Sequence, residues 1–100
     1  MVEIDLSLNN NRIYLGVKVE SYGGRKSFEV NQENLDIIGG NIAKFIEELK
    51  SRANNGFNDS ITLTGATAIP VYLIAFHIVA HSFYEVRYKN EMYNIVVAKH

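Results

Sequence analysis

The chain has 100 residues, of which 47% are hydrophobic and 21% are charged. This length allows one domain over residues 1–100, and the composition is that of a folded globular protein rather than a disordered one. The absence of cysteine excludes a disulfide scaffold and a thiolate zinc site, and the formal net charge of −1 predicts no overall attraction to nucleic acid or to anionic membranes.

The first twenty residues contain two runs in which apolar and polar side chains alternate. Residues 2–8 and 13–19 both have this period of two, which is typical of a strand with one buried face. Three asparagines at 9–11 separate the runs, and asparagine tolerates the backbone angles of tight turns. We therefore predict an antiparallel hairpin, and the alternation from Met1 to Leu8 argues against a signal peptide.

A loop and a long helix are predicted next. Residues 21–27 contain two glycines and the basic pair at 25–26, which favours a flexible loop, and residues 28–30 can add a short extended stretch. Asn31 is the predicted cap of a helix whose apolar residues recur at helical spacing up to Leu49. Gly39 and Gly40 interrupt that pattern, so the helix either kinks there or restarts at Asn41. Residues 53–60 form a predicted polar loop.

The second half of the chain predicts a strand, a helix and two further strands. The strand covers 61–64, the helix covers 69–82 with Pro70 in its first turn, and the last strands cover 83–88 and 92–98. The overall order β-β-α-β-α-β-β predicts an α/β fold with helices packed on one mixed sheet. Because the second helix is apolar nearly all round, a homodimer is expected to cover it.

The longest apolar run, residues 66–80, is shorter than the roughly 20 residues that a membrane span requires. We therefore expect a cytoplasmic protein with no membrane partner.

Two histidines four residues apart, His77 and His81, share one face of the second predicted helix. This spacing suits a metal ion, or a general base with a neighbour that orients it. The alternative is a pair of partly buried histidines that bond to the backbone.

The turn at Thr64, Gly65, Ala66 and Thr67 lies between a predicted strand and a predicted helix. Such turns expose backbone N–H groups to anions, and the two threonines would add hydroxyl donors. The alternative is an ordinary turn capped by threonine.

Tyrosines and cations cluster in the predicted last hairpin. Tyr84, Tyr88 and Tyr93 lie close in sequence to Arg87 and Lys89. Aromatic faces and cations together suit stacked bases and phosphates, although tyrosine is also a common strand residue.

These features together resemble one protein family. The turn glycine Gly65, the pair His77 and His81, then Tyr88 and the final His100 are similar to the small CRISPR-associated proteins of the Csx-three type. That resemblance covers residues 65–100 without a gap. It implies a CARF-like ring-nuclease fold and a homodimer that stacks head to tail into higher assemblies around its ligand.

The resemblance also implies a function in antiviral defence. The ligand would be cyclic tetra-adenylate, an RNA second messenger of type III CRISPR systems, which the protein would bind and cleave. His81 would be the general base, and His77 would orient it. His77 and His100 would ligate Mn²⁺, which some descriptions of the family require. Residues 64–67, Arg87, Tyr88 and Lys89 would bind the ligand.

One position departs from the family pattern. The family carries a catalytic aspartate directly after the tyrosine of the penultimate strand, and this chain has Lys89 there. Three functions follow as alternatives: a ring nuclease, a module that sequesters cyclic tetra-adenylate or a short RNA without cutting it, and a structural homo-oligomeric interaction domain.

Overall fold

The computed structural model describes residues 2–52 and 60–100. Its elements in chain order are β1 (Val2–Asp5), β2 (Val19–Tyr22), β3 (Arg25–Phe28), α1 (Gln32–Arg52), β4 (Ser60–Thr64), α2 (Ile69–Ala80), β5 (Glu85–Lys89) and β6 (Asn94–Lys99). Of the predicted polar loop at 53–60, only Ser60 lies within the described residues, and it begins β4.

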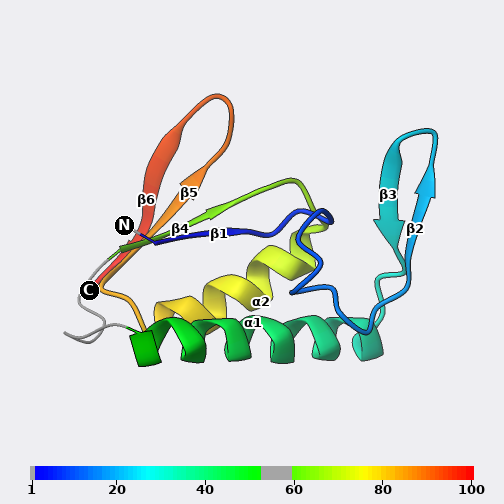
Figure 1. Cartoon of the computed structure of the whole chain (residues 1–100). Helices are drawn as coiled ribbons and strands as arrows, with labels where there is room; N and C mark the ends of the chain where they lie inside the picture. The colour runs from blue at the N-terminus through cyan, green and yellow to red at the C-terminus, as the bar shows by residue number, and fades with distance from the viewer. Residues whose placement is uncertain (1, 53–59) are drawn as a thin grey trace.

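A four-stranded sheet with the order β1-β4-β5-β6 forms one layer of the fold. The first three strands are parallel and β6 is antiparallel to β5. Both helices lie on the same face of this sheet (Figure 1), as expected when two right-handed crossovers advance in the same direction. The predicted α/β class with a mixed sheet is confirmed, and neither of the two helices in residues 2–52 and 60–100 lies on the opposite face of the sheet.

The predicted hairpin between residues 2–8 and 13–19 is wrong. β1 ends at Asp5 and pairs with β4 in parallel, with Ile4 opposite Leu63. The following residues form turns that bury the adjacent side chains of Ile13 and Tyr14, a pattern that a half-buried strand does not allow. The Tyr14 hydroxyl donates a hydrogen bond of 2.6 Å to the Leu6 carbonyl, which holds this segment on the core.

The predicted loop at 21–27 is also wrong. Strands β2 and β3 form a separate antiparallel hairpin in which Tyr22 lies opposite Arg25. Gly23 and Gly24 both have positive φ angles, as a two-residue hairpin turn requires. The element order of the described residues is therefore β-β-β-α-β-α-β-β, with one strand more than predicted there.

Helix α1 is continuous across its two glycines. The Asn31 side chain accepts a hydrogen bond of 2.8 Å from the Asn34 N–H, so the predicted cap is confirmed. At Gly39, a Cβ atom would lie 3.3 Å from Cγ2 of Ile74, which belongs to α2. The glycine thus permits the two helices to approach closely, and no restart at Asn41 is needed.

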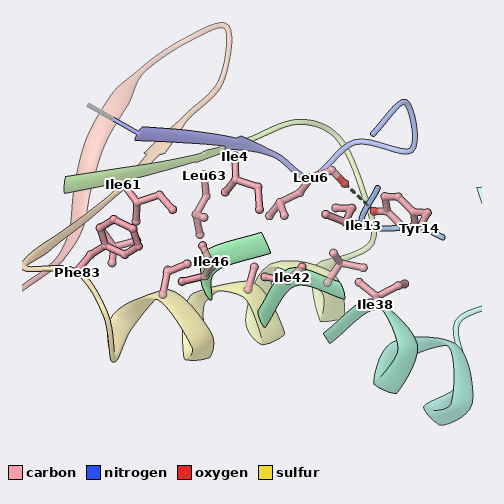
Figure 2. Close-up of a cluster of buried hydrophobic side chains, with 14 residues drawn as sticks. Ile4, Leu6, Ile13, Tyr14, Ile38, Ile42, Ile46, Ile61, Leu63 and Phe83 are labelled. Carbon is pink, nitrogen blue, oxygen red and sulfur yellow. Dashed lines mark hydrogen bonds between the residues drawn. The ribbon is translucent and has the colours of Figure 1, made fainter. Parts of the chain in front are cut away.

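The hydrophobic core lies between the sheet and the two helices (Figure 2). Isoleucines at four-residue intervals on α1 point into it, and alternate residues of β1, β4 and β5 meet them from the sheet. The buried side chains are Ile4, Leu6, Ile13, Tyr14, Ile38, Ile42, Ile46, Ile61, Leu63, Val71, Ala75, Val79, Phe83 and Val86.

Helix α2 is only partly covered by the rest of the chain. Val71, Ala75 and Val79 are fully buried, whereas Ile69 and Leu73 are 74% and 64% exposed. The helix is therefore apolar on a face that packs against nothing described in one copy of the chain. None of the helices in the described ranges has both the length and the apolarity needed to cross a membrane.

Candidate functional site

An open pocket lies where the parallel strands β4 and β5 end. In open α/β sheets, ligands bind beyond the carboxyl ends of the strands. The pocket has a volume of about 600 Å³, within the range of small-molecule sites. Its lining residues are Thr64, Gly65, Ala66, Tyr88, Lys89, Asn90, Glu91 and Met92.

Five of the seven predicted ligand-binding residues line this pocket: Thr64, Gly65, Ala66, Tyr88 and Lys89. The parallel register explains their meeting, because Thr64 lies opposite Lys89 at the ends of the two strands. Thr67 and Arg87 do not line it. Asn90, Glu91 and Met92 were not predicted as site residues, although their place in the turn after Lys89 is a signal that could have found them.

Gly65 is fixed by its contacts with the end of β1. Its φ angle is +102°, and a Cβ atom there would lie 2.3 Å from Asp5 Oδ1 and 2.6 Å from the Ser7 nitrogen. The Asp5 carboxylate is itself held by the Ser7 N–H at 2.8 Å. The glycine is thus required by close packing inside the chain, which is a different reason from the approach of a phosphate.

The two threonine hydroxyls of the turn are not free donors. Thr64 donates its hydroxyl proton to the Lys89 carbonyl at 2.9 Å. The Thr67 and Tyr14 hydroxyls are 2.6 Å apart, and since Tyr14 donates to the Leu6 carbonyl, Thr67 must be the donor to Tyr14. Any hydrogen bonds that this turn donates to an anion must therefore come from backbone N–H groups.

Three tyrosine rings contact one another beside the pocket, edge to face between Tyr72 and Tyr88 and tilted between Tyr88 and Tyr93. The ring centroids of Tyr72 and Tyr88 are 5.5 Å apart, and those of Tyr88 and Tyr93 are 5.9 Å apart. The Tyr72 hydroxyl donates a short hydrogen bond to the Gly65 carbonyl. The pKa of Tyr72 is raised to about 12, mainly because the hydroxyl is partly buried. The nearby Tyr88, Asp5 and Tyr14 raise it further through charge repulsion. Tyr72 thus ties α2 to the turn in its neutral form.

This raised pKa predicts a loss of stability at alkaline pH. The unfolded chain loses the Tyr72 proton near the ordinary pKa of 10, whereas the folded chain keeps it up to about pH 12. The contribution is complete below pH 10 and is lost as the pH rises toward 12. The free energy of unfolding, measured with urea, should fall less between pH 9 and pH 11 for Tyr72→Phe than for wild type. Equal differences would contradict the assignment, and the exposed Tyr22 gives the matched control, Tyr22→Phe.

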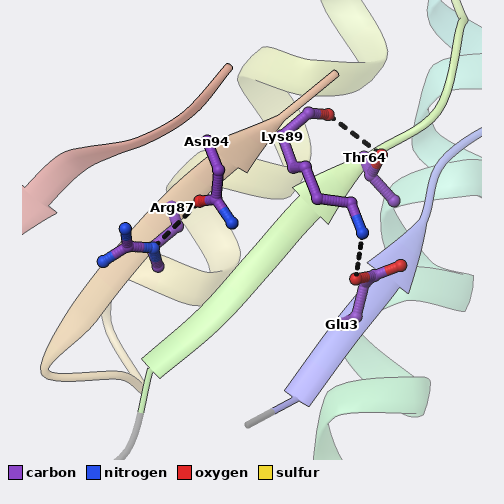
Figure 3. A network of polar contacts seen from close by, with 5 residues as sticks. All are labelled: Glu3, Thr64, Arg87, Lys89 and Asn94. Carbon is purple, nitrogen blue, oxygen red and sulfur yellow. Dashed lines mark hydrogen bonds and ion pairs between the residues drawn. The ribbon is translucent and has the colours of Figure 1, made fainter. Parts of the chain in front are cut away.

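A polar network lies on the face of the sheet that is turned away from the two helices (Figure 3). Lys89 Nζ lies 3.0 Å from Glu3 Oε2, and both side chains are about half exposed. Arg87 donates to Asn94 Oδ1 at 3.0 Å and pairs with Glu85 at 3.3 Å. An exposed ion pair contributes roughly 0–1 kcal/mol, so exchanging Glu3 for an anionic ligand at Lys89 costs little. Arg87 is held more firmly by two partners.

The three histidines lie at the other end of α2. The rings of His77 and His81 are 4.9 Å apart, edge to face, and both side chains are exposed. His100 Nε2 donates a hydrogen bond of 2.9 Å to the Ala80 carbonyl, which can only accept. His77 is eight residues beyond the helix start, which puts it about 12 Å along the axis from the pocket end.

Metal ligation was also predicted for His77 and His100. No group of three or more histidine, aspartate or glutamate side chains that could hold a metal ion is found in the part of the chain that the structure describes. Mn²⁺ prefers oxygen ligands, and imidazoles without a carboxylate do not fit it well. Manganese stays a prediction of the resemblance.

The geometry thus divides the predicted site residues into two groups. The turn, Tyr88 and Lys89 form a pocket at the start of α2, and the histidines form a cluster at its end. The pocket and the histidine cluster are thus separate along α2 in one copy. No protein-family model, curated protein or solved structure gives a significant match to this chain.

Proposed function

We propose that this protein binds a cyclic oligoadenylate, cyclic tetra-adenylate in the first instance, in the pocket at the ends of β4 and β5. The observation that carries the proposal is the meeting of Thr64, Gly65, Ala66, Tyr88 and Lys89 around one open volume. The resemblance over residues 65–100 supplies the ligand, and the pocket supplies groups that suit it.

The chemistry of the pocket suits a nucleotide with a phosphodiester. The N–H group of Ala66, which lines the pocket, makes no hydrogen bond to any described residue, so it is available to a phosphate there. The N–H groups of Thr67 and Ala68, which do not line this pocket, likewise make no hydrogen bond to a described residue. Lys89 adds a positive charge at the pocket wall. Tyr88 and the 86% exposed Met92 offer apolar surface to a base. Glu91 opposes the phosphate charge, so its removal should help binding.

A homodimer is part of the proposal. The exposed apolar residues of α2 and the apolar edge strand β6, with Ile95 and Val97 both more than 40% exposed, form surfaces that a second copy would cover. Heterologous head-to-tail contacts between such dimers would then bring the histidine cluster of one copy over the pocket of another. We therefore propose that cleavage occurs only in trans, with the ligand in the pocket of one copy and the histidines from another. Without such stacking, the protein would bind the ligand without cutting it.

Two substitutions in the pocket test the binding by the sign of their effects. Lys89→Gln removes a charge-assisted contact and should weaken cyclic tetra-adenylate about tenfold, or roughly 1.4 kcal/mol. Glu91→Gln removes a repulsive charge and should raise the affinity for cyclic tetra-adenylate severalfold. Titration calorimetry at two salt concentrations checks both, and wild-type affinity should fall as salt rises.

Lys44→Gln is the matched control, because Lys44 is an exposed residue of α1 that does not line the pocket. Opposite effects at positions 89 and 91, with no effect at 44, would exclude general unfolding as the cause. No heat of binding with the wild type would refute the proposed function. Equal affinities for all four proteins would place the ligand elsewhere.

A further inference from the structure

A two-stranded arm, formed by β2 and β3, projects from the body of the protein (Figure 1). Its strands pair with each other and with no other described strand. Isolated hairpins are marginal in water, so the anchoring at the base of the arm matters. There the Phe28 ring packs on Tyr14, with ring centroids 5.6 Å apart. This contact holds the lower half of β3 close to the core.

A second cavity lies between the base of the arm and the turn after β4. It has a volume of about 320 Å³. Its lining residues are Leu8, Lys26, Ser27, Phe28, Val30, Ala66, Thr67 and Ala68. Ala66 lines both this cavity and the first pocket, so the two volumes flank the same turn.

The lining of the second cavity combines a cation with an apolar wall. Lys26 forms no ion pair with any residue in the described ranges, unlike Lys89, which pairs with Glu3. Phe28 offers an aromatic ring of the kind on which a base stacks, and Leu8 and the 49% exposed Val30 add aliphatic surface. The available N–H groups of the turn lie between this wall and the first pocket. A nucleotide could therefore place its base against the apolar wall and its phosphate at the N–H groups of the turn.

We propose that the arm forms a second nucleotide subsite, so that a cyclic oligoadenylate lies across the turn at Ala66 with neighbouring nucleotides in the two cavities. Lys26 pairs with the phosphate between them. This inference rests on the proposed function, and it adds a binding element that is separate from the β4 and β5 ends. A ligand with one nucleotide fills one cavity, whereas the ring fills both.

Lys26→Gln is the decisive variant. The exposed side chain takes no part in packing, so the variant should fold, and it should weaken cyclic tetra-adenylate tenfold or more by calorimetry. Lys26→Arg keeps the charge and should stay within about threefold of wild type, since a guanidinium also binds phosphate. Lys18→Gln is the matched control, because Lys18 directly precedes β2 but does not line the second cavity.

Adenosine monophosphate is the second probe. It should bind wild type and Lys26→Gln within about twofold of each other if it occupies the first pocket alone. Loss of ring affinity in Lys26→Gln, with Lys18→Gln unchanged, would support the second subsite. Ring affinity that Lys26→Gln leaves unchanged while Lys89→Gln weakens it would overturn the subsite and leave the proposed function standing. Wild type that binds no ring would overturn both.

Discussion

Gly65→Ala is expected to destabilise the protein by at least about 3 kcal/mol, which is enough to unfold much of the population of a marginally stable domain. Two costs add at this position. A non-glycine residue with a φ angle near +102° is strained by about 1–3 kcal/mol. The new Cβ would also lie 2.6 Å from the Ser7 nitrogen, so the backbone of the β1 end would have to move. Thermal and urea unfolding monitored by circular dichroism measure the effect.

Gly40→Ala is the matched control, and it should have the opposite sign. Gly40 lies inside α1 and a Cβ there meets nothing within 4 Å. Alanine in an exposed helix interior is better than glycine by roughly 0.5–1 kcal/mol. If Gly65→Ala and Gly40→Ala both proved as stable as wild type, the close packing of the turn on β1 would be refuted.

The sequence predicted both helices because their apolar spacing and their caps agree. Asn31 caps α1 and Pro70 lies in the first turn of α2, as expected. The last two strands were also predicted close to their true ends, since local alternation and a short turn define them. These elements depend on interactions between residues near in sequence.

The first hairpin could not be predicted correctly, because alternation defines the buried face of a strand and not its partner. Ile4 and Leu6 are buried as the alternation predicts, yet β1 pairs with β4, which lies nearly sixty residues later. The core position of Ile13 and Tyr14 depends on the hydrogen bond from Tyr14 to Leu6, which no pattern of apolar residues reveals. The arm was missed because its side chains are mostly exposed and show no alternation.

The sequence predicted most of the residues of the candidate site, but not that the pocket residues and the histidines lie apart. Thr64 ends a predicted strand and Lys89 directly follows one, and the parallel pairing of β4 with β5 brings the two residues together. The distance between Gly65 and the histidines was available from the helix rise alone, since His77 lies eight residues into α2. The bonds of the two threonine hydroxyls were not available, because they are made to Lys89 and Tyr14, which are distant in sequence.

Cleavage in trans is the second large expected effect. If the protein cuts cyclic tetra-adenylate, His81→Ala should abolish turnover while affinity stays within about tenfold, because a general base acts in the transition state and not in ground-state binding. Lys89→Gln should lower turnover about tenfold at subsaturating ligand, because it weakens binding by about that factor. The two residues lie at opposite ends of α2 in one copy, so each variant retains the half of the site that the other lacks.

Mixing equal amounts of the two impaired proteins therefore tests the geometry directly. In randomly mixed head-to-tail stacks, about a quarter of the contacts join an intact Lys89 pocket to an intact histidine cluster, so that fraction of the wild-type rate should return. The rate is measured as linear product from labelled ring. Sedimentation of each variant alone should show the same assemblies as wild type, which confirms that the loss is chemical.

A mixture of His81→Ala with His77→Ala is the control, because both substitutions lie in the same cluster and no contact in that mixture restores it. Activity in the first mixture and none in the second would show that pocket and histidines act from different copies. Activity in neither, with wild type active, would mean that one chain supplies the whole reacting centre by a rearrangement of α2. Full activity of His81→Ala alone would place the chemistry outside the histidine cluster. Glu3 and Glu85 on the polar face of the sheet would then be the next residues to substitute, since their carboxylates lie beside Lys89 and Arg87.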